Sequence, residues 1–201
     1  MLYDPQLHHR RSIRLKGYDY AQSGLYFITI CCQEKIHRFG EIIDEIGNTS
    51  SNGNKLDDNI AIPSNEIFPV TVQMKLNEFG IVAYNGWMKL PERFPNIELD
   101  VFQIMPNHVH GIILLNEIPS SKSNNYDEKI PASISKIVGA YKSLVTNGCL
   151  ELYKCQNITM GKFWQRNYYE HIIRNEKSFA TISDYIVNNP AKWKEDKFYS
   201  K

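Results

Sequence analysis

The stretch Met105–Leu115, with the sequence MPNHVHGIILL, constrains the fold of this chain more than any other. It ends in an aliphatic run that favours a buried strand, and Pro106, which cannot donate to a β-ladder, marks where that strand begins. Because successive side chains of a strand point to opposite faces, His108 and His110 project from one face. Two imidazoles are therefore expected side by side near the entrance to a sheet.

This pair of imidazoles is a candidate metal site, since each offers a nitrogen lone pair and neither neutral ring repels the other. The same spacing also arises by chance, so a metal site needs a further ligand from elsewhere in the chain. The segment YIVNN offers one. If it is helical, Tyr185 and Asn189 lie one turn apart on the same face, where they would provide a nucleophile and a ligand. Without a partner motif, the default interpretation of Tyr185 is a tyrosine at the rim of a core.

Hydrophobic periodicity and turn residues predict the other elements. Strands are expected at 25–32, 39–43, 70–76, 97–105 and 163–173, in addition to the histidine strand. Helices are expected to begin after the capping residues Asn77, Ser133 and Asn175, and to end before Pro91, near Asn147-Gly148 and before Pro190. Antiparallel neighbours covered by helices predict an α+β fold, although periodicity does not give the strand order.

Length and composition suit one domain. A chain of 201 residues with 42% hydrophobic residues can bury one ordinary core, so we expect a single domain over 1–201. Polar sequence predicts an amino-terminal arm over 1–22 and insertion loops near 44–66 and 117–131.

Three motifs, taken together, resemble a known family. RRSIRLKGYDY begins at Arg10, MPNHVHGI follows, and WQRNYYEHIIRNE precedes YIVNNPAKW, which ends at Trp193. In this order they resemble the REP-associated tyrosine transposases, a branch of the single-tyrosine HUH (IS200-like) transposases. The resemblance implies a ferredoxin-like or RRM-like antiparallel sheet with helices packed on it, the HUH endonuclease fold.

The resemblance also implies a site and an activity. His108 and His110 would be the HUH pair, Tyr185 the nucleophile, and Asn189 the third ligand of Mg²⁺ or Mn²⁺, where related insertion-sequence transposases often have Gln. The implied activity is that of a metal-dependent single-strand DNA endonuclease and strand transferase acting on hairpin-forming DNA through a 5′-phosphotyrosine. Its partner would be single-stranded or hairpin DNA, and both a monomer and a homodimer remain open.

Charge alone does not indicate DNA binding, because the formal net charge is only +1. The distribution is more informative, since basic residues cluster near the implied motifs. The candidate DNA contacts are Arg10, Arg11, Arg14, Lys16, Arg166 and Arg174. Tyr168 or Tyr169 could stack a base. A solvated face and core packing explain these residues equally well.

Cysteine usage and hydropathy bear on the compartment. Cys31 and Cys32 are neighbours on an expected strand and point to opposite faces, and no CxxC spacing suggests zinc. Reduced thiols, with no apolar run of membrane-spanning length and no signal-peptide core, predict a cytoplasmic protein without a membrane segment.

Other functions remain open at this stage. A non-catalytic nucleic-acid-binding regulator would keep the RRM-like sheet and the basic arm, whereas a replication-initiating nickase or an unrelated metal hydrolase would use the histidine pair differently. Tyr185 discriminates between them, because only a tyrosine nucleophile leaves DNA covalently attached to the protein.

Overall fold

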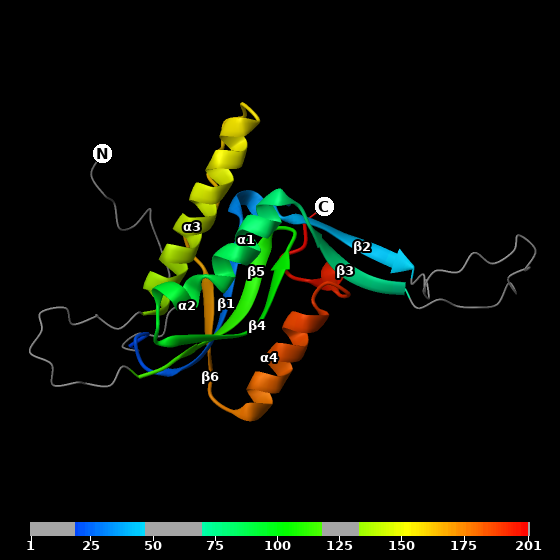
Figure 1. Ribbon diagram of the computed structural model, residues 1–201. Coiled ribbons are helices and arrows are strands. Elements are labelled where there is room, and N and C mark those ends of the chain that lie inside the picture. Colours follow the sequence, from blue (N-terminus) through cyan, green and yellow to red (C-terminus); the bar gives the residue numbers. More distant parts are fainter. Residues whose placement is uncertain (1–18, 47–69, 118–132, 201) are drawn as a thin grey trace, which may run out of the picture.

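The computed structural model describes residues 19–46, 70–117 and 133–200 (Figure 1). Its main sheet is antiparallel, with the strand order β4-β5-β1-β6. Its strands are β1 Gly24–Cys31, β4 Ile97–Met105, β5 His108–Leu115 and β6 Tyr169–Ile173, and a separate two-stranded sheet pairs β2 Gly40–Ile46 with β3 Val70–Leu76. The α-helices are α1 Glu78–Met88, α2 Leu90–Arg93, α3 Ile134–Cys155 and α4 Glu176–Asn188, and the 3₁₀ turns are η1 Gln33–Lys35 and η2 Trp193–Glu195. The predicted α+β class is confirmed.

The four-stranded sheet carries a different helix layer on each face. Helices α1 and α3 pack against each other over the larger core, which contains Ile28, Val109 and Tyr141. Helix α4 covers the opposite face, where Ile112 of β5 and Ile186 of α4 belong to a second, smaller cluster. In Figure 1, α4 lies on the other side of the sheet from α3. Because side chains alternate along β5, the histidines face α4.

The three predicted helix starts are confirmed, because each expected cap accepts a backbone hydrogen bond. The side chain of Asn77 accepts from the N–H of Gly80 at 2.9 Å, and that of Asn175 accepts from Ser178 at 2.8 Å. Ser133 caps α3 in the same way. These bonds satisfy N–H groups that have no partner within the helix, and so they fix where each helix begins.

The predicted end of α3 is wrong, since the helix continues seven residues past Gly148 to Cys155. A Cβ atom at Gly148 would lie 2.7 Å from Cγ1 of Val82 in α1. The glycine therefore allows a close crossing of two helices and does not act as a carboxyl-terminal cap. The end comes at Gln156, before Asn157 in a left-handed conformation with φ 54°.

The predicted strand over 163–173 is confirmed only in its second half. Up to Tyr168, side-chain contacts with α3 replace a β-ladder: the Lys142 amine donates to the carbonyls of Gln165 at 2.8 Å and Asn167 at 3.1 Å, and the Trp164 indole donates to the Lys142 carbonyl. An isolated bridge joins Trp164 to Cys32. Regular pairing with β1 begins only at Tyr169.

Two further expectations concern cysteines and membranes. All four cysteines are free thiols, and Cys31, Cys32 and Cys149 are buried. Within the described ranges, no helix combines the length and apolar character that a bilayer span needs. The basic arm up to residue 18 and most of the two predicted insertion loops lie outside the described residues.

Candidate active site

Strand β5 presents the two histidines on one face, as predicted, and that face is the one covered by α4. His108 and His110 are fully buried, and their ring centroids lie 4.3 Å apart. Strand β1 pairs with β5 so that Cys31 lies opposite His108 and Thr29 opposite His110. The pair therefore sits on a central strand, where neighbouring strands hold the backbone on both sides.

Hydrogen bonds fix the orientation of each imidazole. Nδ1 of His108 donates to the Asn107 amide oxygen at 2.8 Å, so Nε2 of His108 keeps its lone pair. That Nε2 atom is buried and has no hydrogen-bond partner among the described residues. Nδ1 of His110 lies 2.8 Å from the Thr29 hydroxyl, so the other ring nitrogen, Nε2, faces the site.

Burial keeps both imidazoles neutral. Burial, and then the charges of Lys197 and Lys35, lower the pKa of His108 from 6.5 to about 3. The pKa of His110 is also lowered well below 6.5, mainly by burial and by His108, although the Asp196 carboxylate opposes this shift. At neutral pH each ring is therefore uncharged, with one nitrogen protonated and a lone pair on the other that can bind a cation.

Helix α4 brings Tyr185 and Asn189 to the same place. Its inner stripe of Phe179, Ile182 and Ile186 packs on the sheet, which anchors the helix across β4 and β5. The Tyr185 hydroxyl then lies 3.1 Å from Nε2 of His110. Asn189 is 1% exposed, and its amide oxygen has no hydrogen-bond partner in the described part of the chain. The structure thus gathers the four side chains that the two motifs singled out.

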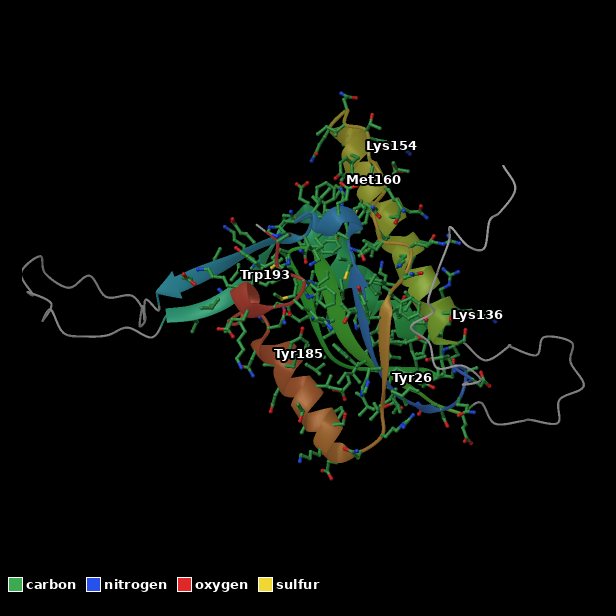
Figure 2. All side chains as sticks on the ribbon, turned by 180° about the vertical axis from the view of Figure 1, so that it is seen from behind. Tyr26, Lys136, Lys154, Met160, Tyr185 and Trp193 are labelled. Carbon is green, nitrogen blue, oxygen red and sulfur yellow. The ribbon has the colours of Figure 1, made fainter. Side chains whose placement is uncertain are left out.

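A fifth residue of the site, Asp196, was not predicted from the sequence. Its Oδ2 accepts hydrogen bonds from the Tyr185 hydroxyl at 2.6 Å and from the Asn189 amide at 2.7 Å, and lies 4.0 Å from Nε2 of His110. The side chain is 1% exposed. Asp196 stands in the charged run KWKEDK, which is typical of a solvated tail, so no local pattern distinguishes it. Only the fold of the chain after α4, which Figure 2 shows at Trp193, returns it to the site.

Asp196 also affects the phenol. Burial, and then the hydrogen bond and the negative charge of Asp196, raise the pKa of Tyr185 above its usual value of 10. The hydrogen bond between Tyr185 and Asn189 opposes this shift. Tyr185 is therefore a neutral phenol at physiological pH, hydrogen bonded to a carboxylate that can accept its proton.

Comparisons with known proteins find relatives of this chain. No protein-family model matches the sequence. An uncharacterized protein of Haemophilus influenzae is 38% identical over 206 residues, which cover 98% of this chain and 97% of that protein. A candidate REP-associated tyrosine transposase of the same organism is 25% identical over 175 residues, covering 87% of this chain and 74% of that protein. In sequence, this chain is thus similar to a REP-associated tyrosine transposase over most of its length.

The solved structure of a REP-associated tyrosine transposase bound to a REP hairpin has the same fold, with a TM-score of 0.51 and 18% sequence identity over 93% of this chain and 77% of that one. The predicted HUH fold is thereby confirmed. The similarity to a REP-associated tyrosine transposase supports a transposase-like function.

The residues of this site fit a divalent cation. One nitrogen each of His108 and His110 and an Asp196 oxygen lie within 4.8 Å of one another. The unpartnered Nε2 of His108 and the unpartnered amide oxygen of Asn189 are buried lone pairs, which are costly unless something binds them. A set of imidazole, amide and carboxylate donors suits a divalent cation.

Of the predicted DNA contacts, the structure describes Arg166 and Arg174. Arg10, Arg11, Arg14 and Lys16 lie outside the described residues. Arg166 precedes β6 and Arg174 follows it, and both side chains are exposed. Arg174 lines a cavity of about 460 Å³ with His171 and Ser178, beside the start of α4. Their contact with DNA stays a prediction.

Proposed function

We propose that this protein is a metal-dependent single-strand DNA endonuclease and strand transferase that acts on hairpin-forming DNA. One observation carries the proposal: the Tyr185 hydroxyl lies 3.1 Å from His110, beside the unpartnered lone pairs of His108 and Asn189. A nucleophile next to convergent metal ligands is what metal-assisted phosphodiester cleavage requires. The hairpin carried by the structurally similar transposase supports this class of substrate.

The ligands of the cation would be His108, His110 and Asn189. Bound there, Mg²⁺ or Mn²⁺ would polarise the nonbridging oxygens of the reacting phosphate. Imidazole and amide ligands are neutral and leave the positive charge available for an anionic substrate. Asp196 lies beside these ligands and already accepts hydrogen bonds from Asn189 and Tyr185.

In the proposed step, Oη of Tyr185 attacks phosphorus, and its proton passes to the Asp196 carboxylate, to which it is already hydrogen bonded. The bond between phosphorus and the 3′ oxygen breaks, and the departing oxygen takes a proton from water. The products are a 5′-phosphotyrosine and a free 3′-OH. Because the new ester keeps the phosphodiester linkage, a second 3′-OH can attack it, release Tyr185 and rejoin strands without ATP.

The site is complete within one chain, because β5, α4 and the segment after α4 supply all of its groups. We therefore propose that residues 1–201 act as one catalytic domain that needs no second copy to form the site, whether it is a monomer or a homodimer. The cytoplasm, where DNA is accessible, is its proposed compartment.

The test is the formation of a covalent adduct. The wild-type protein is incubated with Mn²⁺ and a library of labelled hairpins with single-stranded extensions, and is then denatured and separated by electrophoresis. We expect labelled DNA attached to the protein. Tyr185→Phe should bind the same hairpins and form no adduct, whereas Tyr84→Phe, which removes the hydroxyl of an exposed tyrosine on α1, should form it normally.

No adduct from the wild-type protein across the library would contradict the proposal. Hairpin binding without an adduct would instead support the non-catalytic regulator, which shares the fold.

A further inference from the structure

The candidate site is bordered by a surface that the proposed reaction does not use. Thr29 pairs with His110 on one side and with Tyr169 of β6 on the other, so these three residues form one row across the sheet. Directly opposed residues share a face, and Tyr169 therefore lies on the face of the histidines. Its side chain is 45% exposed, which leaves an aromatic ring open to solvent at the edge of the site.

Phe198 joins this row to the site. Its ring centroid lies 4.9 Å from that of His108, 5.7 Å from that of His110 and 5.4 Å from that of Tyr169. Phe198 is 4% exposed and is held by the hydrogen bond of its N–H to Asp196. The ring is a fixed platform between the histidines and Tyr169.

Two ammonium groups lie over that platform. The Lys197 amine is 4.8 Å from the ring centroid of Phe198 and 5.7 Å from that of Tyr169, and the Lys35 amine is 6.0 Å from that of Phe198. Neither amine forms an ion pair with a carboxylate of the described residues. The Lys35 amine donates a hydrogen bond to the Lys197 carbonyl at 3.0 Å, which leaves its charge uncompensated, so both charges can attract a phosphate group.

Hydrogen bonds also hold the backbone of Lys35 in place. Its carbonyl accepts hydrogen bonds from the Asn107 amide at 3.1 Å and from the Ser200 hydroxyl at 2.8 Å. Lys35 and Glu34 adopt left-handed conformations, with φ 53° and 57°. Non-glycine residues rarely adopt this conformation unless their surroundings stabilise it. The hydrogen bonds to the Lys35 carbonyl therefore hold the turn that places the Lys35 amine.

We propose that Lys35, Lys197 and Tyr169 bind single-stranded DNA next to the reacting phosphate, with the two amines on backbone phosphates and a base stacked on the Tyr169 ring. The inference rests on the proposed function for its substrate. Cations interleaved with an open aromatic ring are the combination that single-stranded nucleic acid requires, since the backbone is anionic and every base has a stacking face. The field of both amines reaches the site, where each contributes to the lowered pKa of His108.

The experiment measures binding without chemistry. The full chain carrying Tyr185→Phe is titrated in Mn²⁺ buffer with a fluorescent 12-nucleotide oligothymidine, and Kd is measured by anisotropy from 50 to 200 mM salt. Each lysine–phosphate contact to a single strand contributes about 0.7 to the slope of log Kd against log salt. Lys35→Ala with Lys197→Ala should therefore lower the slope by about 1.4, and Lys35→Arg with Lys197→Arg should retain it.

A matched control removes two other exposed lysines. Lys89→Ala with Lys154→Ala removes the same charge from the α1 and α3 side of the molecule, and the slope should not change. Tyr169→Ala should weaken binding about 5- to 150-fold at constant salt, as expected for loss of one stacked base, and Tyr169→Phe should bind like its parent.

An unchanged slope in the Lys35 and Lys197 alanine variant, with a lowered melting temperature, would overturn the inference, because the lysines would then only hold the carboxyl-terminal segment. Absence of oligothymidine binding by the parent protein would overturn it as well. The adduct assay on the wild-type protein tests the proposed function separately. An adduct with an unchanged slope refutes only this surface, and a changed slope without an adduct refutes only the catalysis.

Discussion

Asn107→Ala is the substitution that tests most sharply how the fold supports the site. The Asn107 side chain is 1% exposed and joins three segments. Its amide nitrogen donates to the carbonyls of Lys35 at 3.1 Å and Phe198 at 2.9 Å and to the Ser200 hydroxyl at 3.2 Å, while its oxygen accepts from His108 at 2.8 Å. One amide thus links η1, β5 and the carboxyl-terminal segment.

The size of the effect follows from what the substitution leaves unpaired. The Lys35 carbonyl keeps its bond from Ser200, whereas the Phe198 carbonyl and Nδ1–H of His108 lose the partner that the structure gives them. A buried polar group without a partner costs about 1–3 kcal/mol, so two such groups lower the free energy of unfolding by about 2–6 kcal/mol. Because His108 also loses the bond that orients it, the affinity for Mn²⁺ should fall about 10- to 100-fold.

Urea denaturation of the metal-free protein measures the first quantity, and titration with Mn²⁺ followed by electron paramagnetic resonance measures the second. Asn96→Ala is the matched control, since Asn96 is also buried but its side chain makes one long bond of 3.5 Å to the Asn116 carbonyl. Asn96→Ala should lower the free energy of unfolding by less than about 1 kcal/mol. If Asn107→Ala costs no more than this control and binds Mn²⁺ like the wild type, the reasoning is wrong.

Three further predictions follow from the same contacts. Gly111→Ala would place a Cβ atom 2.3 Å from the Trp87 ring and should lower the free energy of unfolding by about 1–3 kcal/mol in urea, whereas Gly139→Ala, with open space around it, should raise it by up to about 1 kcal/mol. The pKa of His108 is about 3 in the folded protein and 6.5 in the unfolded chain, so the unfolded chain takes up the proton first as the pH falls. Between pH 7 and pH 5, the free energy of unfolding of the metal-free wild type should therefore fall by about 2 kcal/mol more than that of His108→Gln. Equal decreases in the two proteins would contradict this. Asp196→Asn should slow adduct formation at least about 100-fold in a single-turnover time course, and an unchanged rate would remove Asp196 as the proton acceptor.

Local patterns predicted the parts of the site that lie on regular elements. Alternation along a strand put His108 and His110 on one face, and helical spacing put Tyr185 and Asn189 on another. The structure shows these two faces packed together, because the apolar stripe of α4 lies against β4 and β5. Both patterns are short-range, and each was read from a few residues.

The rest depended on contacts between distant parts of the chain. Asp196 reaches Tyr185 only because the segment after α4 folds back, and nothing in its charged surroundings indicates this. Gly148 looked like a helix end because a glycine that admits a close helix crossing and a glycine that caps a helix are the same residue. The strand order β4-β5-β1-β6 likewise reflects pairing of β1 with β5 and β6, far along the sequence.

The most direct measurement identifies the residue that carries the DNA. The wild-type protein is incubated with Mn²⁺ and hairpin DNA, the adduct is digested with nuclease and protease, and the modified peptide is sequenced by mass spectrometry. The account predicts a nucleotide joined through its 5′ phosphate to Tyr185. A modification on any other residue, or a 3′-linked nucleotide, would contradict it.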